Sequence, residues 1–457
     1  MTRGDLKAVH DTIAANHPGV VDPQNPGFKD WLEKGYAKAL AVADQAKSFE
    51  DYQRALRLYK TGFRDGHVGV IFHLNPDTLS WPGFVLYGTK ATNIQAVAAE
   101  PDAGVKAGDR LLGCDGQNVD ALLAAHTDAY YWNADIPHLR YGAINRMFLR
   151  PQGWSITQPE LDTRQQIKIC QFSSGTVTLK WRGGDYADVL AKYDAALATP
   201  QEPKLRQIDG VWLLSAPTFY FPTDNGIAKM KAFIADVTAK APDLRKGPLI
   251  IDVRGNGGGS SRWGDMIVSA IWGEPWLTYL GGKDVSYVEW RVSQANVKQI
   301  GWIMNFVRKQ GGMTPDELKA YSAFRDQMAT GVQQHAALLR QPDDAQSPPA
   351  LPASNPVTGK VFFLTDRSCG SACLDFADRM HSLPGVTQIG LPTYADSVYL
   401  EANIVPLPSG IAELEYPMKV YRNRARGNNE WYEPKMRWPG GPMTDDDAIV
   451  RWVKTLN

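Results

Sequence analysis

The sequence predicts a multidomain protein of the mixed α/β class, on the basis of its length and two strand-turn-helix patterns. At 457 residues the chain exceeds the usual domain size of ~100–200 residues, so it can build several hydrophobic cores. Residues 247–259 are predicted to form an apolar strand that runs into a glycine cluster, and residues 360–380 a second apolar strand, a turn and a helix. Two units of this kind favour an α/β layer.

The N-terminal segment, residues 1–62, mixes alanine, leucine, lysine and aspartate at helical spacing, which predicts a small helical domain. Glycines at its end break the helical pattern, and an alternating, β-branched strand follows. We assign residues 63–80 to a linker strand, with His67 at the turn between the two elements. A junction of this kind can present a side chain to a cleft.

Residues 81–184 are predicted to form a β-rich domain. Within it, residues 104–119 combine a turn, a strand and an Asp-Gly hairpin, residues 121–165 look like an insertion, and residues 176–181 supply a closing strand. The turn, strand and hairpin resemble those of a PDZ domain. An unrelated β-domain with an Asp-Gly turn is the alternative.

Residues 185–457 are predicted to form the α/β core, into which residues 284–350 are inserted as a helical cap or lid. The core includes an amphipathic helix over residues 222–241 and the two apolar strands. The insertion is polar, helical in pattern and ends in a proline-rich stretch. No internal repeat is evident.

Charge and composition exclude several classes of function. The chain has 49 lysines plus arginines and 49 aspartates plus glutamates. No block of like charge provides a surface that would bind nucleic acid or an anionic membrane. No run approaches the ~20 apolar residues of a membrane span, and residues 1–6 lack the apolar stretch of a secretory signal. We therefore expect a soluble chain with a protein or peptide partner; the sequence does not indicate its oligomeric state.

Four cysteines, Cys114, Cys170, Cys369 and Cys373, are too few for a disulfide scaffold and lack the paired C-x-x-C spacing of a zinc site. Buried thiols are the expectation, with room for one pair to bridge. Nothing in the sequence calls for a metal or a nucleotide cofactor. A phosphate-binding P-loop is disfavoured because the glycine cluster is not followed by lysine and serine or threonine.

Ser371 is a candidate nucleophile because it lies where a buried strand turns into a helix, and the free N–H groups of a helix N-terminus favour a developing anion. A serine in this place is also a common helix N-cap, which is the more frequent role. The glycine cluster, residues 255–259, can point N–H groups into one space, as an oxyanion hole requires. A tight turn without function is the alternative for the cluster.

His67, in Asp65-Gly66-His67, is a candidate general base. An imidazole with a pKa near ~6.5 can take a proton from a hydroxyl at neutral pH. The chain has eight histidines, and a lone histidine is more often structural. Its position alone therefore does not single it out.

Together these motifs resemble the paired signatures of the tail-specific, or C-terminal processing, protease family. The first is Leu-Ile-Ile-Asp-Val-Arg followed by Gly-Asn-Gly-Gly-Gly (residues 249–259), and the second is Leu-Thr-Asp-Arg-Ser-Cys-Gly-Ser-Ala (residues 364–372). The likeness spans roughly residues 60–440. It implies a serine peptidase with a ClpP/crotonase-like α/β catalytic core and an inserted PDZ-like domain.

By this resemblance Ser371 is the nucleophile, and the N–H groups of Ala372 and of a glycine in the cluster, Gly258, form the oxyanion hole. The lysine base of many family members is missing. Residues 389–396 contain no aromatic-Gly-Lys and end in Asp396, which cannot act as that lysine does.

The tricorn and interphotoreceptor retinoid-binding branch of the family also lacks this lysine, and many of its members carry Asp-Gly-His or Ser-His before the PDZ-like region. Asp65-Gly66-His67 is similar to this pattern, so the resemblance makes His67 the base. Gly66 replaces the serine of tricorn-like members, which leaves open the acceptor that fixes the histidine. The candidates are Asp65, Asp396, Glu401 and Glu430, and Glu430 lies where the tricorn-like glutamate is expected.

The leading hypothesis is acyl transfer to water, with Ser371 attacking a peptide carbonyl and His67 accepting and returning the proton. The β-rich domain and the inserted cap would then restrict entry to peptides or flexible protein tails. The alternative is a catalytically silent protein that binds a peptide or an apolar ligand in the same cleft. A cysteine nucleophile at Cys369 or Cys373 lacks a base. Most relatives act outside the cytoplasm, so the resemblance favours a periplasmic or secreted location.

Overall fold

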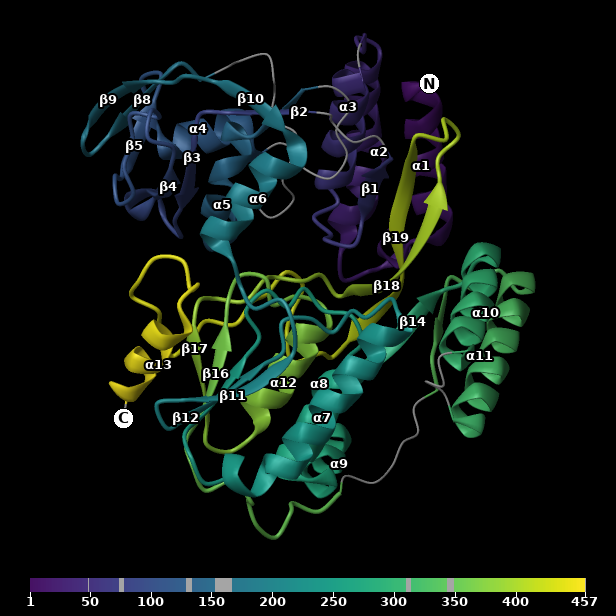
Figure 1. The fold of residues 1–457 in the computed structure, drawn as a ribbon. Coiled ribbons are helices and arrows are strands. Elements are labelled where there is room, and N and C mark those ends of the chain that lie inside the picture. Colours follow the sequence, from purple (N-terminus) through teal and green to yellow (C-terminus); the bar gives the residue numbers. More distant parts are fainter. Residues whose placement is uncertain are drawn as a thin grey trace. The chain divides into compact units, whose positions relative to one another are not determined.

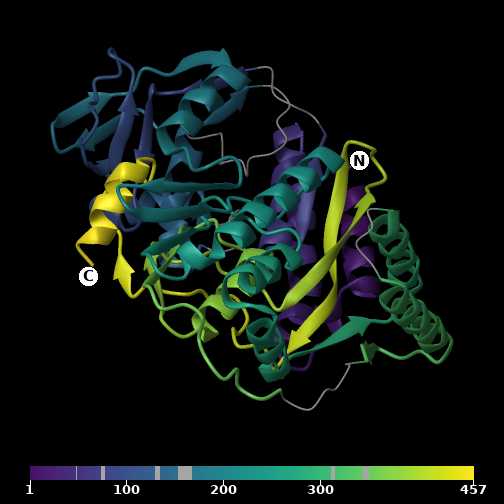
Figure 2. The ribbon, with the colours of Figure 1, turned by 60° about the horizontal axis from the view of Figure 1, so that its bottom comes forward.

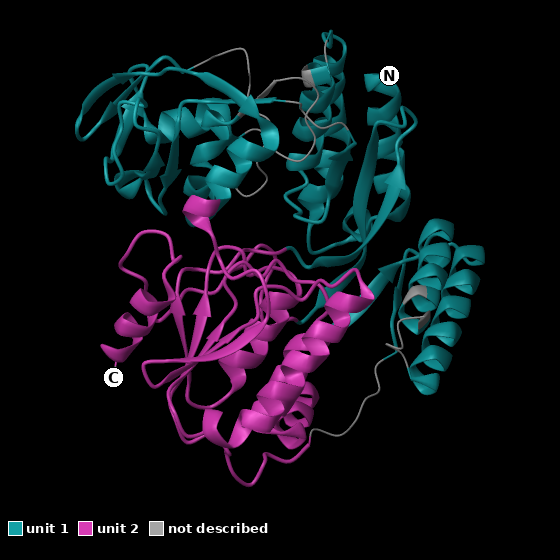
Figure 3. Cartoon of the chain, in the orientation of Figure 1, with its two compact units in different colours: residues 1–194, 287–343, 397–423 teal, residues 195–286, 344–396, 424–457 magenta. Residues whose placement is uncertain are grey.

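The computed structural model describes residues 1–47, 49–73, 78–128, 134–152, 167–309, 314–342 and 349–456. The chain forms two compact units that alternate along the sequence (Figure 3). Unit 1 comprises Met1–Asp194, Tyr287–Asp343 and Ser397–Asn423, and unit 2 comprises Ala195–Ser286, Asp344–Asp396 and Arg424–Asn457. The finer division at residues 63, 81 and 185 stays a prediction.

Unit 1 begins with α1 (Thr2–Asn16), the 3-10 turn η1 (Pro18–Val21), α2 (Pro26–Ala43) and α3 (Phe49–Thr61). Apolar side chains recur at helical spacing and are buried, as Leu6, Val9 and Ile13 are in α1. A proline at the first turn starts α2, where no backbone donor is needed. The helical pattern that the sequence predicts for this segment is therefore present.

The helices share a core with an antiparallel sheet built from distant parts of the chain. Its order is β1 (Gly69–Phe72), β19 (Ala412–Arg422), β14 (Tyr287–Arg291) and β15 (Leu338–Arg340), and β18 (Tyr399–Pro406) also pairs with β19. Tyr52 of α3 and Tyr416 of β19 lie in this one core, both fully buried. Figures 1 and 2 show β18 and β19 side by side next to the N-terminal helices.

The segment predicted as a cap contains two helices, α10 (Gln294–Lys309) and α11 (Pro315–Gln333), which belong to unit 1. Helix α11 begins with a capping box between Thr314 and Glu317. Phe324 packs against Trp290 of β14 with ring centroids 5.8 Å apart. The helices therefore join the core that the N-terminal helices build.

The β-rich part of unit 1 has a hydrophobic core of its own. It contains β2 (Thr78–Trp81), β3 (Phe84–Tyr87), η2 (Ala91–Asn93), β4 (Gln95–Ala99), β5 (Leu111–Cys114), β6 (Gln117–Asn118), α4 (Val119–His126), α5 (Pro137–Gly142), η4 (Ile144–Phe148), β7 (Arg150–Gln152), β8 (Ile169–Phe172), β9 (Gly175–Thr178), β10 (Arg182–Asp185) and α6 (Tyr186–Leu197). Asp115 and Gly116 form the predicted hairpin turn, with φ of 47° and 77°. Residues 129–133 and 153–165 of the predicted insertion lie outside the described residues.

Unit 2 is built around a six-stranded sheet in the order β11-β12-β13-β16-β17-β20. The strands are β11 (Lys204–Ile208), β12 (Val211–Ser215), β13 (Leu249–Asp252), β16 (Val361–Thr365), β17 (Val386–Gly390) and β20 (Met436–Arg437), and the helices are α7 (Asp224–Leu244), α8 (Arg262–Trp272), α9 (Glu274–Lys283), α12 (Ala372–Ser382) and α13 (Asp446–Lys454). β11 pairs antiparallel with β12, and the other pairs are parallel. Strands β13 and β16 are buried along their whole length, as expected for a parallel sheet covered by helices such as α7, α8 and α12 (Figure 1).

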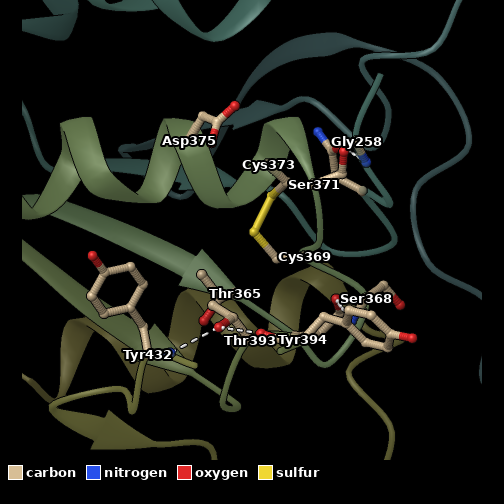
Figure 4. Close-up of a disulfide and its surroundings, with 12 residues drawn as sticks. Gly258, Thr365, Ser368, Cys369, Ser371, Cys373, Asp375, Thr393, Tyr394 and Tyr432 are labelled. Carbon is tan, nitrogen blue, oxygen red and sulfur yellow. Dashed lines mark hydrogen bonds between the residues drawn. A yellow bond between two sulfur atoms is a disulfide. The ribbon is translucent and has the colours of Figure 1, made fainter. Parts of the chain in front are cut away.

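Both pairs of cysteines form disulfides, so the expectation of buried thiols is wrong. Cys114 bridges to Cys170 across the β5–β8 pair, where the two Cα atoms lie 4.0 Å apart. Cys369 bridges to Cys373, and this bond ties the turn after β16 to the first turn of α12 (Figure 4). Pairs in strands distant in sequence cannot be recognised from spacing alone. The second bridge also removes the free thiol that a cysteine nucleophile would require.

No helix in the described part of the chain is long and apolar enough to cross a membrane. The same residues contain no cluster of histidine, cysteine, aspartate and glutamate side chains that could hold a metal ion.

Candidate active site

Two loops of unit 2 start side by side because the strands that carry them are neighbours. β13 and β16 pair in parallel with Asp252 opposite Leu364, so their carboxyl ends lie at the same edge of the sheet. The glycine cluster follows β13, and the turn with Ser371 follows β16. The N–H of Gly370 donates to the carbonyl of Asn256 at 3.3 Å, which joins the two loops directly.

Ser371 adopts a backbone conformation that an ordinary helix cap does not have. Its φ is 50° and its ψ is −125°, and its side chain makes no capping hydrogen bond to α12. Non-glycine residues rarely adopt a positive φ, and such backbone costs ~1–3 kcal/mol that the surroundings must offset. A strained serine on a sharp strand-to-helix turn holds its hydroxyl away from the main chain. The capping role considered for Ser371 is therefore not what the structure has.

Gly258 lies against Ser371, and only a glycine fits there (Figure 4). Its φ is 103°, and an added Cβ would lie 2.7 Å from the Ser371 Cβ and 2.9 Å from the Ala372 nitrogen. The absent side chain of Gly258 therefore lets the glycine cluster approach the main chain of the serine turn closely.

The two predicted oxyanion donors differ in their present partners. No hydrogen bond among the described residues uses the Ala372 N–H. The Gly258 N–H donates to the side-chain oxygen of Asn256 at 2.9 Å. An oxyanion would have to replace this acceptor for Gly258 to serve as a donor.

Asp396 holds the main chain of the serine. Its Oδ2 accepts the Ser371 N–H at 3.0 Å, and the residue is 3% exposed. The neighbouring Tyr394 N–H donates to the carbonyl of Cys369 at 3.0 Å. The segment of Tyr394 and Asp396 thus anchors the turn at two points around Ser371.

Glu430 lies on the strand-like segment beside Asp396. The two residues form an isolated antiparallel bridge, and the Asn429 N–H donates to the Asp396 carbonyl at 2.8 Å. The Glu430 carboxylate accepts the Gly427 N–H at 2.7 Å, which closes its own turn. Glu401, another candidate acceptor, instead pairs with Lys419 in unit 1 at 3.0 Å.

His67 lies in unit 1, in the turn between α3 and β1. Its backbone N–H donates to Asp65 Oδ1 at 2.9 Å. Its ring Nδ1 lies 3.9 Å from the same oxygen, and 20% of its side chain is exposed. Among the candidate acceptors, Asp65 thus lies beside the His67 ring within unit 1, at a distance too long for a hydrogen bond.

Asn256 is a site residue that sequence reasoning missed. It is fully buried, and its side-chain N–H donates to the Ala216 carbonyl at 2.8 Å while its Oδ1 accepts the Gly258 N–H. Its own carbonyl accepts from Gly370. A single asparagine therefore connects the end of β12, the glycine cluster and the serine turn. An amide side chain inside a run of glycines was the available signal.

Buried charged side chains bind the two loops close to the ends of β13 and β16. Burial works to lower the pKa of Arg254, but Asp252 and Asp446 raise it above its usual value. Asp366 accepts the Gly255 N–H at 3.0 Å and the Ser368 N–H at 2.9 Å, so it too bridges the two loops. Burial raises the pKa of Asp366, which these two hydrogen bonds partly offset.

The structure brings Ser371, Ala372, Gly258 and Asp396 together in unit 2, and His67 and Asp65 together in unit 1. Residues 217–431, which contain both loops, match peptidase family S41. This match places the protein in the class of serine peptidases, which are hydrolases. The sequence-based expectation of a serine peptidase is thus confirmed at this level.

Among solved structures, mature CPAF is similar to this chain with a TM-score of 0.62 and 15% sequence identity, over 95% of this chain and 92% of CPAF. Mature CPAF complexed with lactacystin gives the same TM-score and identity, over 100% of this chain and 97% of the other. At this identity the likeness establishes a shared multidomain α/β fold. No curated protein sequence matches the chain.

The tricorn protease, whose branch the sequence motifs resemble, is a weaker structural match. The TM-score is 0.41 and the identity 13%, and the match covers 100% of this chain but 36% of the tricorn chain. Similarity at this level carries no argument about mechanism. Membership of the tricorn-like branch stays a prediction.

Proposed function

We propose that the protein hydrolyses peptide bonds through an acyl-enzyme, with Ser371 as the nucleophile and His67 as the general base. His67 takes the proton from the Ser371 hydroxyl as its oxygen attacks the peptide carbonyl, and then gives it to the leaving amine. Water, deprotonated by the same imidazole, then cleaves the ester and restores the free serine.

The conformation of Ser371 is the observation that carries the proposal. Ser371 has a positive φ of 50° but makes no capping hydrogen bond, so its strained backbone does not serve to stabilise the start of α12. The Ser371 N–H is held by Asp396, and Gly258 packs directly against the turn of Ser371 and Ala372. These features suit a hydroxyl held ready to attack a carbonyl whose oxygen becomes negative.

The oxyanion donors in this proposal are the N–H groups of Ala372 and Gly258. Ala372 begins α12, so its N–H points out of the helix start, where the helix dipole favours negative charge. Gly258 can contribute once the developing oxyanion competes with Asn256 for its N–H. Asp396 and Glu430 are further proposed members of the relay behind the base.

The substrates proposed are peptides and flexible protein tails, because an extended chain is what a peptidase cleft between loops can accept. The β-rich part of unit 1 and the helices α10 and α11 would limit entry to such chains. This part of the proposal rests on the resemblance to tail-specific proteases.

Labelling with a fluorophosphonate that reacts with activated serines tests the proposal. We expect one covalent adduct on Ser371 at neutral pH, none in Ser371→Ala, and labelling at least about a hundredfold slower in His67→Ala. Hydrolysis of an activated ester substrate, whose leaving group makes acylation fast, should show a burst of released alcohol followed by a slower steady rate. An unlabelled wild-type protein that still binds peptides would instead identify a silent binding protein.

A further inference from the structure

A buried histidine that the proposed reaction does not use lies beside the turn that carries His67. His17 follows α1 and is completely buried. Its Nδ1 accepts the Gly19 N–H at 2.9 Å, so its ring proton is on Nε2. Nε2 lies 3.0 Å from Asp65 Oδ2, which makes His17 a donor to Asp65. A ring that accepts at Nδ1 and donates at Nε2 is neutral; burial lowers the pKa of His17, and the hydrogen bond with Asp65 opposes this shift.

Asp65 receives two further hydrogen bonds at its other oxygen. Oδ1 accepts the His67 N–H at 2.9 Å and the Ser397 hydroxyl at 2.8 Å. The residue is 1% exposed, and a carboxylate that accepts from three donors is satisfied in its ionised form. Asp65 is thus a buried, fully hydrogen-bonded anion two residues from His67.

Asp65 interacts differently with the main chain of His67 and with its ring. The hydrogen bond to the His67 N–H fixes the turn. The ring nitrogen at 3.9 Å is beyond hydrogen-bonding distance, so it feels Asp65 through charge alone. An opposite charge at ~4–6 Å shifts a pKa by about 1–3 units toward the charged form.

Other charged groups also face His67. Glu415 lies opposite Gly69 in the β1–β19 pair; burial raises the pKa of Glu415, and His67 acts in the opposite direction. Lys60 interacts with Glu415 from α3, and burial lowers the pKa of Lys60 to about 8. Asp65 differs from these groups because it also binds the His67 main chain.

We propose that His17, Asp65 and Ser397 form a positioning network that fixes the turn of His67 and supplies the counter-charge for its imidazolium. The purpose of the network rests on the proposed function, since an imidazolium forms when His67 accepts the serine proton. The contacts themselves lie within unit 1. Ser397 directly follows Asp396 in the chain, so the residue that holds the Ser371 N–H is bonded to one that holds Asp65.

The first test measures the pKa of His67 by NMR titration of the full chain with labelled histidine rings, using His67→Asn to assign the signal. Asp65→Asn should lower the pKa of His67 by about 1–3 units, because it removes the negative charge that favours the imidazolium. The matched control is Asp22→Asn. Asp22 is a buried carboxylate of the same core that bonds Tyr399 and Arg422, so its loss should leave the pKa of His67 in place.

The second test uses the pair His17→Phe and His17→Gln. Phenylalanine can keep the stacking on Phe28, whose ring lies 4.2 Å from that of His17, but cannot donate to Asp65. Glutamine can donate. We expect His17→Phe to lower kcat of peptide hydrolysis about tenfold or more at unchanged KM, and His17→Gln to recover most of it. This pair also decides the proposal if Asp65→Asn does not fold.

Failure of the network and failure of the proposed function can be told apart. An unlabelled wild-type protein without hydrolysis contradicts the function, while the NMR titration still tests the network. A pKa of His67 that stays unchanged in Asp65→Asn, or shifts equally in Asp22→Asn, overturns the network. Equal kcat in His17→Phe and His17→Gln overturns it as well. If both proposals hold, the acid limb of the kcat/KM profile moves to lower pH in Asp65→Asn by the shift seen in the titration.

Discussion

Ser371 differs from a capping serine in both of the properties that define a cap. An N-cap serine has extended backbone angles and accepts an N–H of the first helical turn through its hydroxyl. Ser371 has a φ of 50° and lacks that bond. Its conformation is maintained by neighbours, since Asp396 binds its N–H and Asn256 binds the N–H of Gly370. The proposed role of the Ser371 hydroxyl as the reacting group gives a reason for these backbone angles.

Gly258→Ala should lower kcat/KM by about 10²–10³, the cost of losing an oxyanion interaction. The added Cβ would meet the Ser371 Cβ at 2.7 Å and the Ala372 nitrogen at 2.9 Å, so it would force apart the two loops that carry the proposed oxyanion donors. Steady-state hydrolysis and the rate of fluorophosphonate labelling measure the loss. Gly257→Ala is the control, because a Cβ at Gly257 meets nothing within 4 Å. Equal effects of the two substitutions would contradict a role for Gly258 in the proposed oxyanion hole.

At the scale of elements, the site depends on the junctions where β13 and β16 end. Parallel pairing places both junctions at one edge of the sheet, and the Cys369–Cys373 bond then links the turn to α12 on either side of Ser371. The disulfide encloses Ser371 in a short covalent loop. It therefore restricts the main chain at the position where the strain lies.

The double variant Cys369→Ala, Cys373→Ala should lose about 2 kcal/mol of unfolding free energy, from the entropy of a short closed loop. Fluorophosphonate labelling of Ser371 should slow about tenfold but persist, because no cysteine is the nucleophile. Denaturant unfolding and adduct mass measure the two effects. Cys114→Ala, Cys170→Ala is the control, which should cost about 4 kcal/mol for its longer loop and leave labelling unchanged. Free thiols in the denatured, unreduced wild-type protein would contradict both bridges.

At the scale of the whole molecule, the two units are interleaved along the chain. Strand β1 of unit 1 pairs with β19, which follows most of unit 2 in sequence. The core around α1, α2 and α3 likewise needs β14, β18 and β19. Neither unit is therefore a continuous segment that can be cut out at one position.

A fragment of residues 1–197 should fail to protect α1–α3, although the β-rich part keeps its own core. Hydrogen–deuterium exchange of the fragment should show fast exchange in these helices and slow exchange in β3 to β9. Co-expression with residues 198–457 should restore protection to the level of the full chain, because β14, β18 and β19 are then present. Slow exchange of α1–α3 in the isolated fragment would contradict the shared core.

Much of the local structure could be predicted from sequence because it depends on neighbours in the chain. Apolar spacing predicts the N-terminal helices, and the strands β13 and β16 are continuous apolar runs. The Asp115-Gly116 pair predicts the hairpin turn that these two residues form. Ser371 and the glycine cluster stand out because each directly follows a buried strand. Their chemical roles, and that of His67, stay predictions.

Other features could not be predicted because they depend on contacts between distant residues. Spacing does not reveal that Cys114 meets Cys170, or that both bridges form. His17 becomes a donor to Asp65 only after the chain folds 48 positions back on itself. Asn256 reads as one polar residue among glycines until Gly258 and Ala216 are seen bonded to its side chain.

The sequence by itself determined the class of this protein, a serine peptidase with a strand-to-turn serine and a glycine cluster, because those motifs are contiguous and their backbone requirements are local. Tertiary structure alone decided the strained backbone angles of Ser371, the hydrogen bond from its N–H to Asp396 and the burial of His17 beside Asp65. Hydrogen bonds between groups 25 or 48 positions apart have no pattern in a linear sequence. They form when folding removes water from both groups, so that each group becomes the hydrogen-bonding partner of the other.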